Sequence, residues 1–388
     1  MYDNKQVIGY VTPANPFTDR KHWSGLTYKI REGIERAGYK VVWIPYPTVG
    51  FLIRCWNLII KLYSKMRFPG QRYLLGENFV PTAKILARSI KKCPSINECD
   101  CLFFPGGGQL GLYLQTNIPI IYYSGATVKS MIGYYWHDIC KRSQKIAVDI
   151  DKRASLSATI NIKASDWAIN SINNDYGCPA NRSFVLEYGP AIDTKDITIK
   201  DAYKGGKLKV LFSGVDWERK NGDIAVAVVS KLRDKGIDAS LVVAGIRQLP
   251  EYCSRLEYVE SVGFLNKNTP DGYNKYISLF KECDILFVPT KAECAGVVFC
   301  EASAFGLPSY TFATGGTPNY VVDGKNGRTI QISDSAGDTF AQLIYDDIKS
   351  GKLSEMRDGA LAHSREKLSW EAWSERFKKI MKSCFAED

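Results

Sequence analysis

Short apolar runs alternate with amphipathic segments along most of the chain. Several of these runs are almost continuous stretches of valine, isoleucine, leucine and aromatic residues. Such runs are typical of parallel strands that helices cover on both faces. The strands that this pattern predicts are 6–11, 40–44, 100–104, 119–123, 209–213, 240–244, 258–262, 284–288 and 309–312.

Between the strands, apolar positions recur every three or four residues, which predicts amphipathic helices. Residues 24–37 form one such segment, with Ser24 as its expected N-cap and Gly38 as its C-terminal stop. Residues 222–235 repeat this arrangement and end before Gly236. Because strands and helices alternate in two successive series, the sequence predicts an α/β protein with two Rossmann-like domains.

The domain boundary is expected in the polar segment 193–207, which contains a pair of glycines and ends at a new strand. A chain of 388 residues is also too long for one ordinary core. We therefore expect an N-terminal domain over 1–192 and a C-terminal domain over 207–368. The closing segment 369–388 carries aromatic residues on one helical stripe, and we assign it to the first domain.

The composition narrows the class of protein. Hydrophobic residues make up 45% of the chain and charged residues 24%, as in soluble globular proteins, and no apolar run is long enough to span a bilayer. The chain begins without the basic head and apolar core of a signal peptide. Eleven scattered cysteines and only three histidines predict free thiols in a reducing cytoplasm and no metal centre.

The net charge of +10 predicts affinity for anions, which include nucleotides, phosphorylated lipids, anionic membranes and nucleic acids. No basic and aromatic platform is visible, so we expect no nucleic-acid partner. Residues 51–67 are apolar and basic without an acidic residue, which suits peripheral contact with an anionic membrane or a lipid-phosphate acceptor. A helix between two sheets, with its basic side chains in water, is the alternative.

The segment 291–308 carries two glutamates, Glu293 and Glu301, among small and apolar residues. Burying a carboxylate without a partner is unfavourable, so we expect both to bind a ligand. Gly296 opens a helix between them, and the free N–H groups at a helix start favour an anion. Carboxylates that accept hydrogen bonds from hydroxyls, close to an anion site, indicate a sugar nucleotide.

A second group of charges follows the strand 209–213. This strand leads through Gly214 to Arg219 and Lys220, just before a helix. Two cations at this place could neutralise a diphosphate, although a solvated charge pair in a loop is an equal alternative. A pair of glycines at 315–316, with Thr317 as the expected N-cap of a further helix, is a weaker signal of the same kind.

Three stretches occur in a characteristic order: W-E-R-K-N-G (217–222), E-C-A-G-V-V-F-C-E-A (293–302) and G-G-T-P-N-Y-V-V-D-G-K-N-G (315–327). Together they resemble the donor-binding domain of GT-B-fold retaining glycosyltransferases of family 4, the glycosyl transferases group 1. The resemblance covers 207–330 and is looser over 1–190. It implies two Rossmann-like domains that face each other across a cleft, with the C-terminal helix crossing back to the first domain.

The resemblance implies roles for the residues of the second domain. Glu293 is expected to contact hydroxyls of the transferred sugar and Glu301 to hold the ribose, while Arg219 and Lys220 neutralise the leaving phosphate. Backbone N–H groups cradle the diphosphate, and the segment 263–266 contacts the base. Catalytic roles fall to Glu293, Arg219 and Lys220, and donor binding to Gly214, Arg219, Lys220, Leu265, Glu293, Gly296, Val297, Val298 and Glu301.

In the first domain the resemblance implies an acceptor site. Ser24 and Gly25 are the expected acceptor residues after the first strand. Gly125 follows the strand 119–123, at a place where similar sequences read S-D-A-T, so a glycine replaces an acidic side chain. The stretch D-I-D at 149–151 lies in a charged helical segment, and we interpret its likeness to a metal-binding Asp-x-Asp motif as chance.

The expected function is that of a metal-independent retaining hexosyltransferase without a cofactor. It transfers a hexose-type sugar from a nucleotide-sugar donor to a hydroxyl of a cell-surface glycan or lipid-linked precursor, in polysaccharide biosynthesis. Two alternatives remain: a GT-B pseudoenzyme that supports a partner transferase, which Gly125 favours, and a sugar-nucleotide epimerase or inverting transferase of the same fold. The sequence leaves the base, the sugar and the acceptor open.

Overall fold

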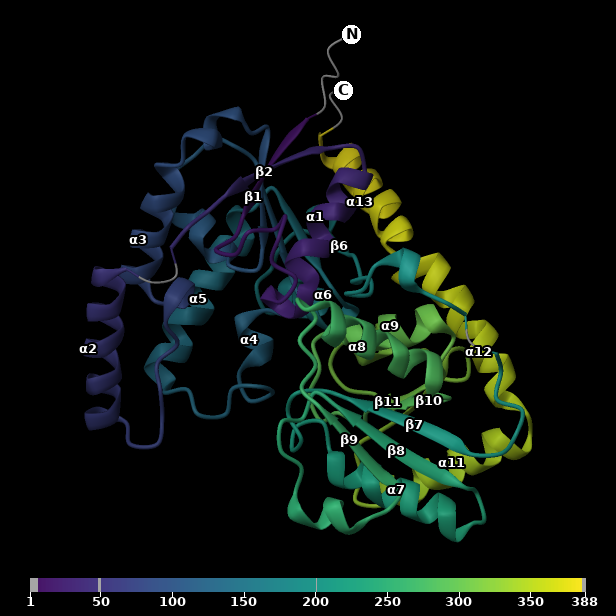
Figure 1. Cartoon of the computed structure of the whole chain (residues 1–388). Coiled ribbons are helices and arrows are strands. Elements are labelled where there is room, and N and C mark those ends of the chain that lie inside the picture. Colours follow the sequence, from purple (N-terminus) through teal and green to yellow (C-terminus); the bar gives the residue numbers. More distant parts are fainter. Residues whose placement is uncertain (1–5, 48–49, 200, 386–388) are drawn as a thin grey trace. The chain divides into compact units, whose positions relative to one another are not determined.

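The structure, a computed structural model, describes residues 6–47, 50–199 and 201–385. The chain divides into two compact units (Figure 1). Unit 1 consists of Met1–Leu186 with Ser374–Asp388, and unit 2 consists of Glu187–Trp373. All eleven cysteines are free thiols. None of the helices in the described residues is long and apolar enough to cross a membrane.

Unit 1 contains a parallel sheet of six described strands in the order β2-β1-β3-β4-β5-β6. This order reverses between β1 and β3. The strands are β1 (Val7–Val11), β2 (Lys40–Ile44), β3 (Cys101–Pro105), β4 (Ile120–Ser124), β5 (Ile160–Lys163) and β6 (Ser183–Val185). The α-helices are α1 (Leu26–Arg36), α2 (Phe51–Arg67), α3 (Val80–Lys91), α4 (Val128–Met131), α5 (Lys141–Ser157) and α6 (Asp166–Asn174).

Unit 2 contains a second parallel sheet of six described strands, in the order β12-β11-β10-β7-β8-β9. This is the Rossmann order, which reverses between β7 and β10. The strands are β7 (Leu208–Ser213), β8 (Ala239–Ala244), β9 (Val259–Gly263), β10 (Ile285–Phe287), β11 (Ser309–Phe312) and β12 (Gly327–Ile330).

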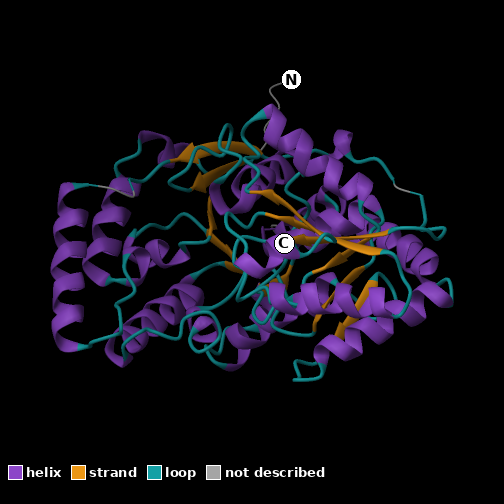
Figure 2. Ribbon diagram, turned by 60° about the horizontal axis from the view of Figure 1, so that its bottom comes forward, coloured by secondary structure: helices purple, strands orange, loops and turns teal. Residues whose placement is uncertain are grey.

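Helices cover both faces of the unit 2 sheet, with α8 and α9 on one face and α7 and α11 on the other (Figure 1). The alternation of helices and strands along the chain is visible in Figure 2. The helices are α7 (Gly222–Asp234), α8 (Pro270–Glu282), α9 (Val297–Phe305), α10 (Thr317–Tyr320), α11 (Ala336–Lys349), α12 (Lys352–His363) and the closing α13 (Trp370–Phe385).

Every strand that the hydrophobic pattern predicts is present, with each described end within one residue of its expected place. The pattern missed β5, β6 and β12. Strand β5 escaped because two of its four residues are polar, although Asn161 and Lys163 are both fully buried. Strand β6 has only three residues, and β12 begins with glycine and arginine.

One local prediction is wrong, and one alternative is excluded. Ser24 is not the N-cap of α1, because the helix starts at Leu26 with Gly25 as its N-cap. Helix α2 matches the segment 51–67, but it does not lie between two sheets, since Ile53 and Ser64 are its only buried residues. The alternative of a helix enclosed by the fold is therefore excluded.

Helix α13 carries the expected aromatic stripe, and its residues are buried. The first turn of α13 belongs to unit 2, where Nε1 of Trp370 donates to the carbonyl oxygen of Pro190 at 2.7 Å. The remainder belongs to unit 1. There the ring of Phe377 lies 5.8 Å from that of Tyr39 and 5.9 Å from that of Phe103, so the last helix completes the core of the first unit.

We predict that Phe377→Ala destabilises the protein by about 3–5 kcal/mol, because it removes a fully buried aromatic side chain and leaves a cavity. The exposed neighbour Lys378 provides the control, and Lys378→Ala should change the free energy of unfolding by less than about 0.5 kcal/mol. Chemical denaturation monitors both. Equal stabilities of the two variants would show that α13 is not part of this core.

Candidate functional site

The strand order of unit 2 gathers residues that are far apart in the sequence. In a sheet of this order, ligands bind outside the carboxyl ends of the strands at the point where the order reverses, here β7 and β10. Arg219 and Lys220 lie in the loop after β7, and Glu293 lies in the loop after β10. Lys220 and Glu293 are 73 positions apart, yet their side chains are in contact.

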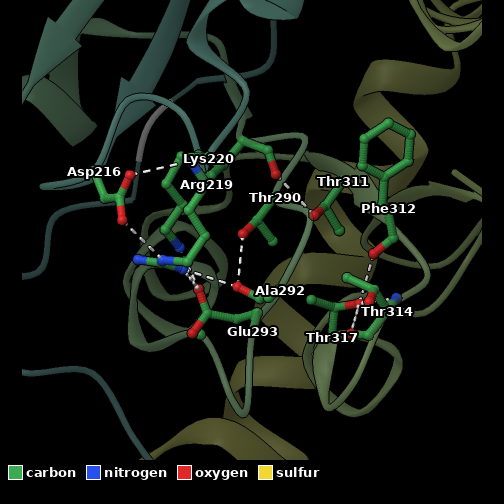
Figure 3. Close-up of polar contacts among 12 residues, drawn as sticks. Asp216, Arg219, Lys220, Thr290, Ala292, Glu293, Thr311, Phe312, Thr314 and Thr317 are labelled. Carbon is green, nitrogen blue, oxygen red and sulfur yellow. Dashed lines mark hydrogen bonds and ion pairs between the residues drawn. The ribbon is translucent and has the colours of Figure 1, made fainter. Parts of the chain in front are cut away.

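Glu293 is at the centre of a cluster of charges (Figure 3). Its Oε2 atom forms an ion pair with Nζ of Lys220 and lies 3.7 Å from Nη1 of Arg219. The Arg219 guanidinium donates to the carbonyl oxygen of Ala292 at 2.8 Å, and its Nε lies 3.5 Å from Oδ2 of Asp216. The side chains of Lys220 and Glu293 are only 7% and 14% exposed, so water screens their charges weakly.

Hydrogen bonds fix the loop that carries Glu293. Oγ1 of Thr290 donates to the carbonyl oxygen of Ala292 at 2.9 Å (Figure 3). The amide of Gly316 donates to the carbonyl oxygen of Glu293 at 2.9 Å, which ties the loop after β10 to the loop after β11. The amide of Lys291 donates to the carbonyl oxygen of Arg219 at 2.9 Å, which ties it to the loop after β7.

The glycine pair at 315–316 therefore stabilises the loop that carries Glu293, through the hydrogen bond from the amide of Gly316. The prediction that Thr317 is the N-cap of α10 is wrong, since Gly316 is the N-cap and Thr317 is the first helical residue. Oγ1 of Thr317 instead donates to the carbonyl oxygen of Phe312 at 2.6 Å and accepts from the amide of Thr314 at 3.0 Å (Figure 3).

The structure brings Lys220, Arg219 and Glu293 into mutual contact, whereas the sequence analysis assigned the two cations to a phosphate and the glutamate to a sugar. The two assignments are compatible. Each carboxylate oxygen has two lone pairs, so a carboxylate held by two cations can still accept hydrogen bonds from hydroxyls. A ligand with a phosphate next to a hydroxyl-bearing ring can engage both charges at once.

Gly296 is the N-cap of α9, as expected, with φ at 114°. A Cβ atom at this position would lie 2.4 Å from the ring of Phe299, so the backbone and the packing both require glycine. Val297 and Val298 form the first turn of α9 and are half-buried. Backbone N–H groups in a first turn have no partner four residues earlier within the helix, which makes them available to an anion.

Glu301 lies in the second turn of α9 and is only 1% exposed. The hydroxyl of Tyr276 donates to its Oε2, and Nζ of Lys267 lies 3.5 Å from its Oε1. In the described part of the chain, Oε1 accepts no hydrogen bond. Burial, and then the charge of Glu301, raises the pKa of Tyr276 well above its ordinary value, so the tyrosine keeps the proton that it donates.

Sequence reasoning missed Lys267 and Tyr276. Tyr276 lies on α8 beside the buried residues Ile277, Leu279 and Phe280, so its position in the sequence predicts core packing. Lys267 precedes that helix among polar residues. Only the packing of α8 against α9 connects the two residues to the glutamate.

Gly214 and Leu265 lie at the same edge of the sheet, after β7 and β9. A Cβ atom on Gly214 would lie 3.0 Å from Cγ of Lys220, so this glycine makes room for the stem of the lysine. Leu265 is half-buried, and its neighbour Phe264 is exposed with Cζ of Arg247 5.3 Å from its ring centroid. The role of Leu265 in base recognition remains a prediction.

The expected acceptor residues lie in unit 1. Ser24 and Gly25 follow β1 with φ values of 58° and 92°, and Trp23 precedes them at 50°. Left-handed backbone is unfavourable for Trp23 and Ser24, and such strain is concentrated at functional sites. The run of glycines at 106–108 follows β3, at the point where the strand order of unit 1 reverses. Sequence reasoning missed this loop, although its three glycines were a visible signal.

Gly125 lies directly after β4, separated from the loop after β1 by strand β3. The preceding Ser124 accepts a hydrogen bond at its Oγ from Nζ of the fully buried Lys163, at 2.6 Å. Burial lowers the pKa of Lys163 to about 8, against the opposing charge of Asp151. A buried cation thus lies beside the position where similar sequences have an acidic side chain.

The stretch 149–151 has a structural role. Asp151 is fully buried and accepts hydrogen bonds from the hydroxyls of Tyr122 at 2.9 Å and Tyr176 at 2.7 Å, while Asp149 is exposed. Across residues 6–47, 50–199 and 201–385, no group of three or more histidine, cysteine, aspartate or glutamate side chains could hold a metal ion.

Solved structures of other proteins have the same fold as this chain. The sucrose-phosphate synthase of Thermosynechococcus elongatus superposes with a TM-score of 0.69 at 15% identity, over 98% of this chain and all of that chain. The Anabaena protein HepE, solved in complex with UDP-glucose, superposes with a TM-score of 0.63 at 14% identity, over 97% and 99% of the two chains. The two Rossmann-like units therefore define a protein of the GT-B fold.

Sequence comparison finds similarity over part of the chain. Residues 193–358 match the model described as glycosyl transferases group 1. A D-inositol 3-phosphate glycosyltransferase of Stackebrandtia nassauensis is 29% identical over 168 residues, which is 39% of this chain and 37% of the relative. The chain thus matches little more than a third of that relative's length.

We predict that Tyr276→Phe lowers the free energy of unfolding by about 1–3 kcal/mol, because it removes a hydrogen bond from a buried carboxylate. Tyr345→Phe is the control, since Tyr345 is half-buried and its ring lies next to Lys235 and Lys349 instead of a buried carboxylate. Denaturant titration of both variants measures the difference. A loss no larger than that of the control would show that Tyr276 does not support Glu301.

Proposed function

We propose that the protein is a retaining, metal-independent glycosyltransferase. It transfers a hexose-type sugar from a nucleotide-sugar donor to a hydroxyl of a cell-surface glycan or lipid-linked precursor. The observation that carries the proposal is the contact of Arg219 and Lys220 with Glu293 where the strand order of unit 2 reverses. This cluster combines positive charge with a hydroxyl acceptor beside the start of α9, and a nucleotide sugar presents the complementary groups.

In the proposal, two carboxylates bind the rings of the donor. Glu293 accepts hydrogen bonds from hydroxyls of the transferred sugar. Oε1 of Glu301 is buried and accepts no hydrogen bond from the described residues, so it is available to a ribose hydroxyl. Lys267 and Tyr276 hold the Glu301 carboxylate in place for that contact.

The diphosphate lies between these rings. Backbone N–H groups of Gly296, Val297 and Val298 donate to its oxygens. Arg219 and Lys220 stabilise the negative charge that develops on the leaving phosphate, the part that a divalent cation plays in other transferases. Because both cations are already fixed by Glu293, little reorganisation is required when the bond breaks.

The proposed reaction takes place on one face of the sugar. The bond between the anomeric carbon and the phosphate breaks with oxocarbenium character, and the acceptor hydroxyl forms the new bond on the same face. The departing phosphate takes the proton of that hydroxyl. This scheme requires no side-chain base, so the glycine at position 125 is compatible with it.

Similar proteins support the donor class: the Anabaena protein was solved in complex with UDP-glucose, and the Stackebrandtia nassauensis relative is a D-inositol 3-phosphate glycosyltransferase. The acceptor is proposed to bind unit 1, near Ser24, Gly25 and Gly125. Peripheral contact with an anionic membrane through residues 51–67 forms part of the proposal, since a lipid-linked precursor is carried on such a surface. The protein acts in the cytoplasm, in polysaccharide biosynthesis.

A second candidate is a nucleotide-binding protein of the same fold that supports a partner transferase without turnover. Gly125 favours it, because no acidic side chain follows β4. The two candidates differ in turnover and share nucleotide binding, so binding and transfer are measured separately.

We predict that Glu293→Gln and Lys220→Met each lower kcat/KM by at least about a hundredfold, since each removes a charge that the transition state uses. Glu355→Gln and Lys352→Met, at exposed positions of α12, are the controls and should retain activity. Sugar transfer is followed by product NMR, which also reports retention at the anomeric carbon. Inverted product, or full activity of the Glu293 variant, contradicts the mechanism.

We also predict that one of UDP-, GDP-, ADP- or dTDP-sugars raises the thermal unfolding midpoint and that Glu301→Ala removes most of this shift. The Glu355→Gln variant should keep the shift. An unchanged shift in the Glu301 variant would contradict its assignment to the ribose. A clear shift without transfer to any acceptor would favour the second candidate.

A further inference from the structure

Helix α2, labelled in Figure 1, presents an unusual amount of apolar surface. Seven large apolar residues of this helix are exposed, with exposed fractions between 38% and 80%. They are Phe51, Leu52, Trp56, Leu58, Ile59, Leu62 and Met66. Half of the fourteen large apolar residues exposed in the described chain thus lie on one helix of 17 residues. Such a concentration marks an interaction surface.

The sequence of α2 divides into three stripes, because positions three or four residues apart share one face of a helix. The buried stripe faces the protein, and it consists of the buried residues Ile53 and Ser64 and the half-buried residues Asn57 and Ile60. The apolar stripe faces outward, and its residues are Phe51, Cys55, Ile59, Leu62 and Met66. A basic row, Arg54, Lys61 and Lys65, lies on one flank between them.

The buried stripe is what attaches α2 to unit 1. Ile53 packs into the apolar core that also contains Leu86 of α3. Oγ of Ser64 donates to the carbonyl oxygen of Gln71 at 2.9 Å. The helix is therefore held in a fixed orientation by one side, and the outward apolar stripe is not required for that attachment.

The charge around α2 indicates which partner covers the apolar stripe. No acidic residue occurs between Arg36 and Glu77, and Arg54, Lys61, Lys65 and Arg67 of the helix are all exposed. A second copy of the chain that docked through α2 would bring two basic rows together, which is unfavourable. An anionic bilayer supplies both an apolar interior for the stripe and negative headgroups for the row.

We infer that α2 lies flat in the headgroup region of an anionic membrane, with the stripe from Phe51 to Met66 inserted and Lys61 and Lys65 on lipid phosphates. The purpose of this membrane contact rests on the proposed function. The contact would bring the unit that is expected to bind the acceptor to the surface that carries lipid-linked precursors. Binding itself requires neither donor nor acceptor. It can therefore fail or succeed independently of sugar transfer.

The test is co-sedimentation of the full chain with vesicles of phosphatidylcholine alone or mixed with phosphatidylglycerol, without sugar nucleotide. We expect binding to the mixed vesicles that weakens as salt increases. Ile59→Ser with Leu62→Ser should lower this binding by about tenfold or more. Ile199→Ser with Ile332→Ser is the matched control, because all four side chains are 54% exposed, and it should bind as the unaltered protein does.

A second pair of variants tests the charge. Lys61→Ser with Lys65→Ser should lower binding to the mixed vesicles by about tenfold or more, because each basic side chain near an anionic surface contributes to the affinity. Lys281→Ser with Lys352→Ser, two exposed lysines of unit 2, is the control and should leave binding unchanged. Thermal unfolding should show the same midpoint for all of these variants, since exposed substitutions change stability little.

Three results would overturn the inference. One is the absence of binding to mixed vesicles at low salt. Another is an equal loss of binding in the α2 variants and their matched controls. The third is a dimer, seen by sedimentation velocity without vesicles, that Ile59→Ser with Leu62→Ser dissociates. Measuring sugar transfer to a water-soluble acceptor in the same variants separates loss of membrane contact from loss of catalysis, because α2 variants should retain that activity.

Discussion

The ion pair between Lys220 and Glu293 holds together the two loops on which the proposed donor site depends. It joins the ends of β7 and β10, the neighbouring strands between which the order of the unit 2 sheet reverses. Arg219 adds a second cation and a hydrogen bond to the backbone of the same loop. These charged side chains are largely buried. Removing one of them would therefore leave the charge of its partner buried without compensation. The geometry of the site and the stability of its loops are therefore maintained by the same contacts.

The two glutamates near the start of α9 have different surroundings. Glu293 lies before the helix in a loop braced by backbone hydrogen bonds, and cations surround its carboxylate. Glu301 lies inside the helix, where Tyr276 donates a hydrogen bond to one carboxylate oxygen and Lys267 forms an ion pair with the other. One carboxylate is thus placed among charges and the other among buried side chains. This difference supports the proposal that the two carboxylates contact different hydroxyl-bearing rings of one ligand.

In unit 1, the buried ionisable groups form hydrogen bonds within the fold. Asp151 accepts hydrogen bonds from two tyrosines, and Lys163 donates to Ser124 at the end of β4, so these ionisable groups stabilise the fold close to the expected acceptor edge. The outward features of the unit are the strained turn at Trp23 and Ser24 and the apolar stripe of α2. The proposed recognition of a lipid-linked acceptor depends on these surface features and on no group of buried charges.

The sequence by itself determined the secondary structure and the class of the fold, because continuous apolar runs and helical spacing reflect burial that each element needs wherever it packs. It also predicted Gly296 as the start of α9, since a helix start after a strand has a local signature. It could not determine the N-cap of α1, where the backbone at Ser24 is left-handed, or the strand β5, whose buried Asn161 and Lys163 find partners elsewhere in the chain. Only the tertiary structure joined Lys220 to Glu293, placed Tyr276 beside Glu301 and left the apolar stripe of α2 uncovered. Each of these features depends on which elements become neighbours in space. The order of strands in a sheet decides which elements are neighbours, and it brings together residues that are too far apart in the sequence for a local pattern to connect them.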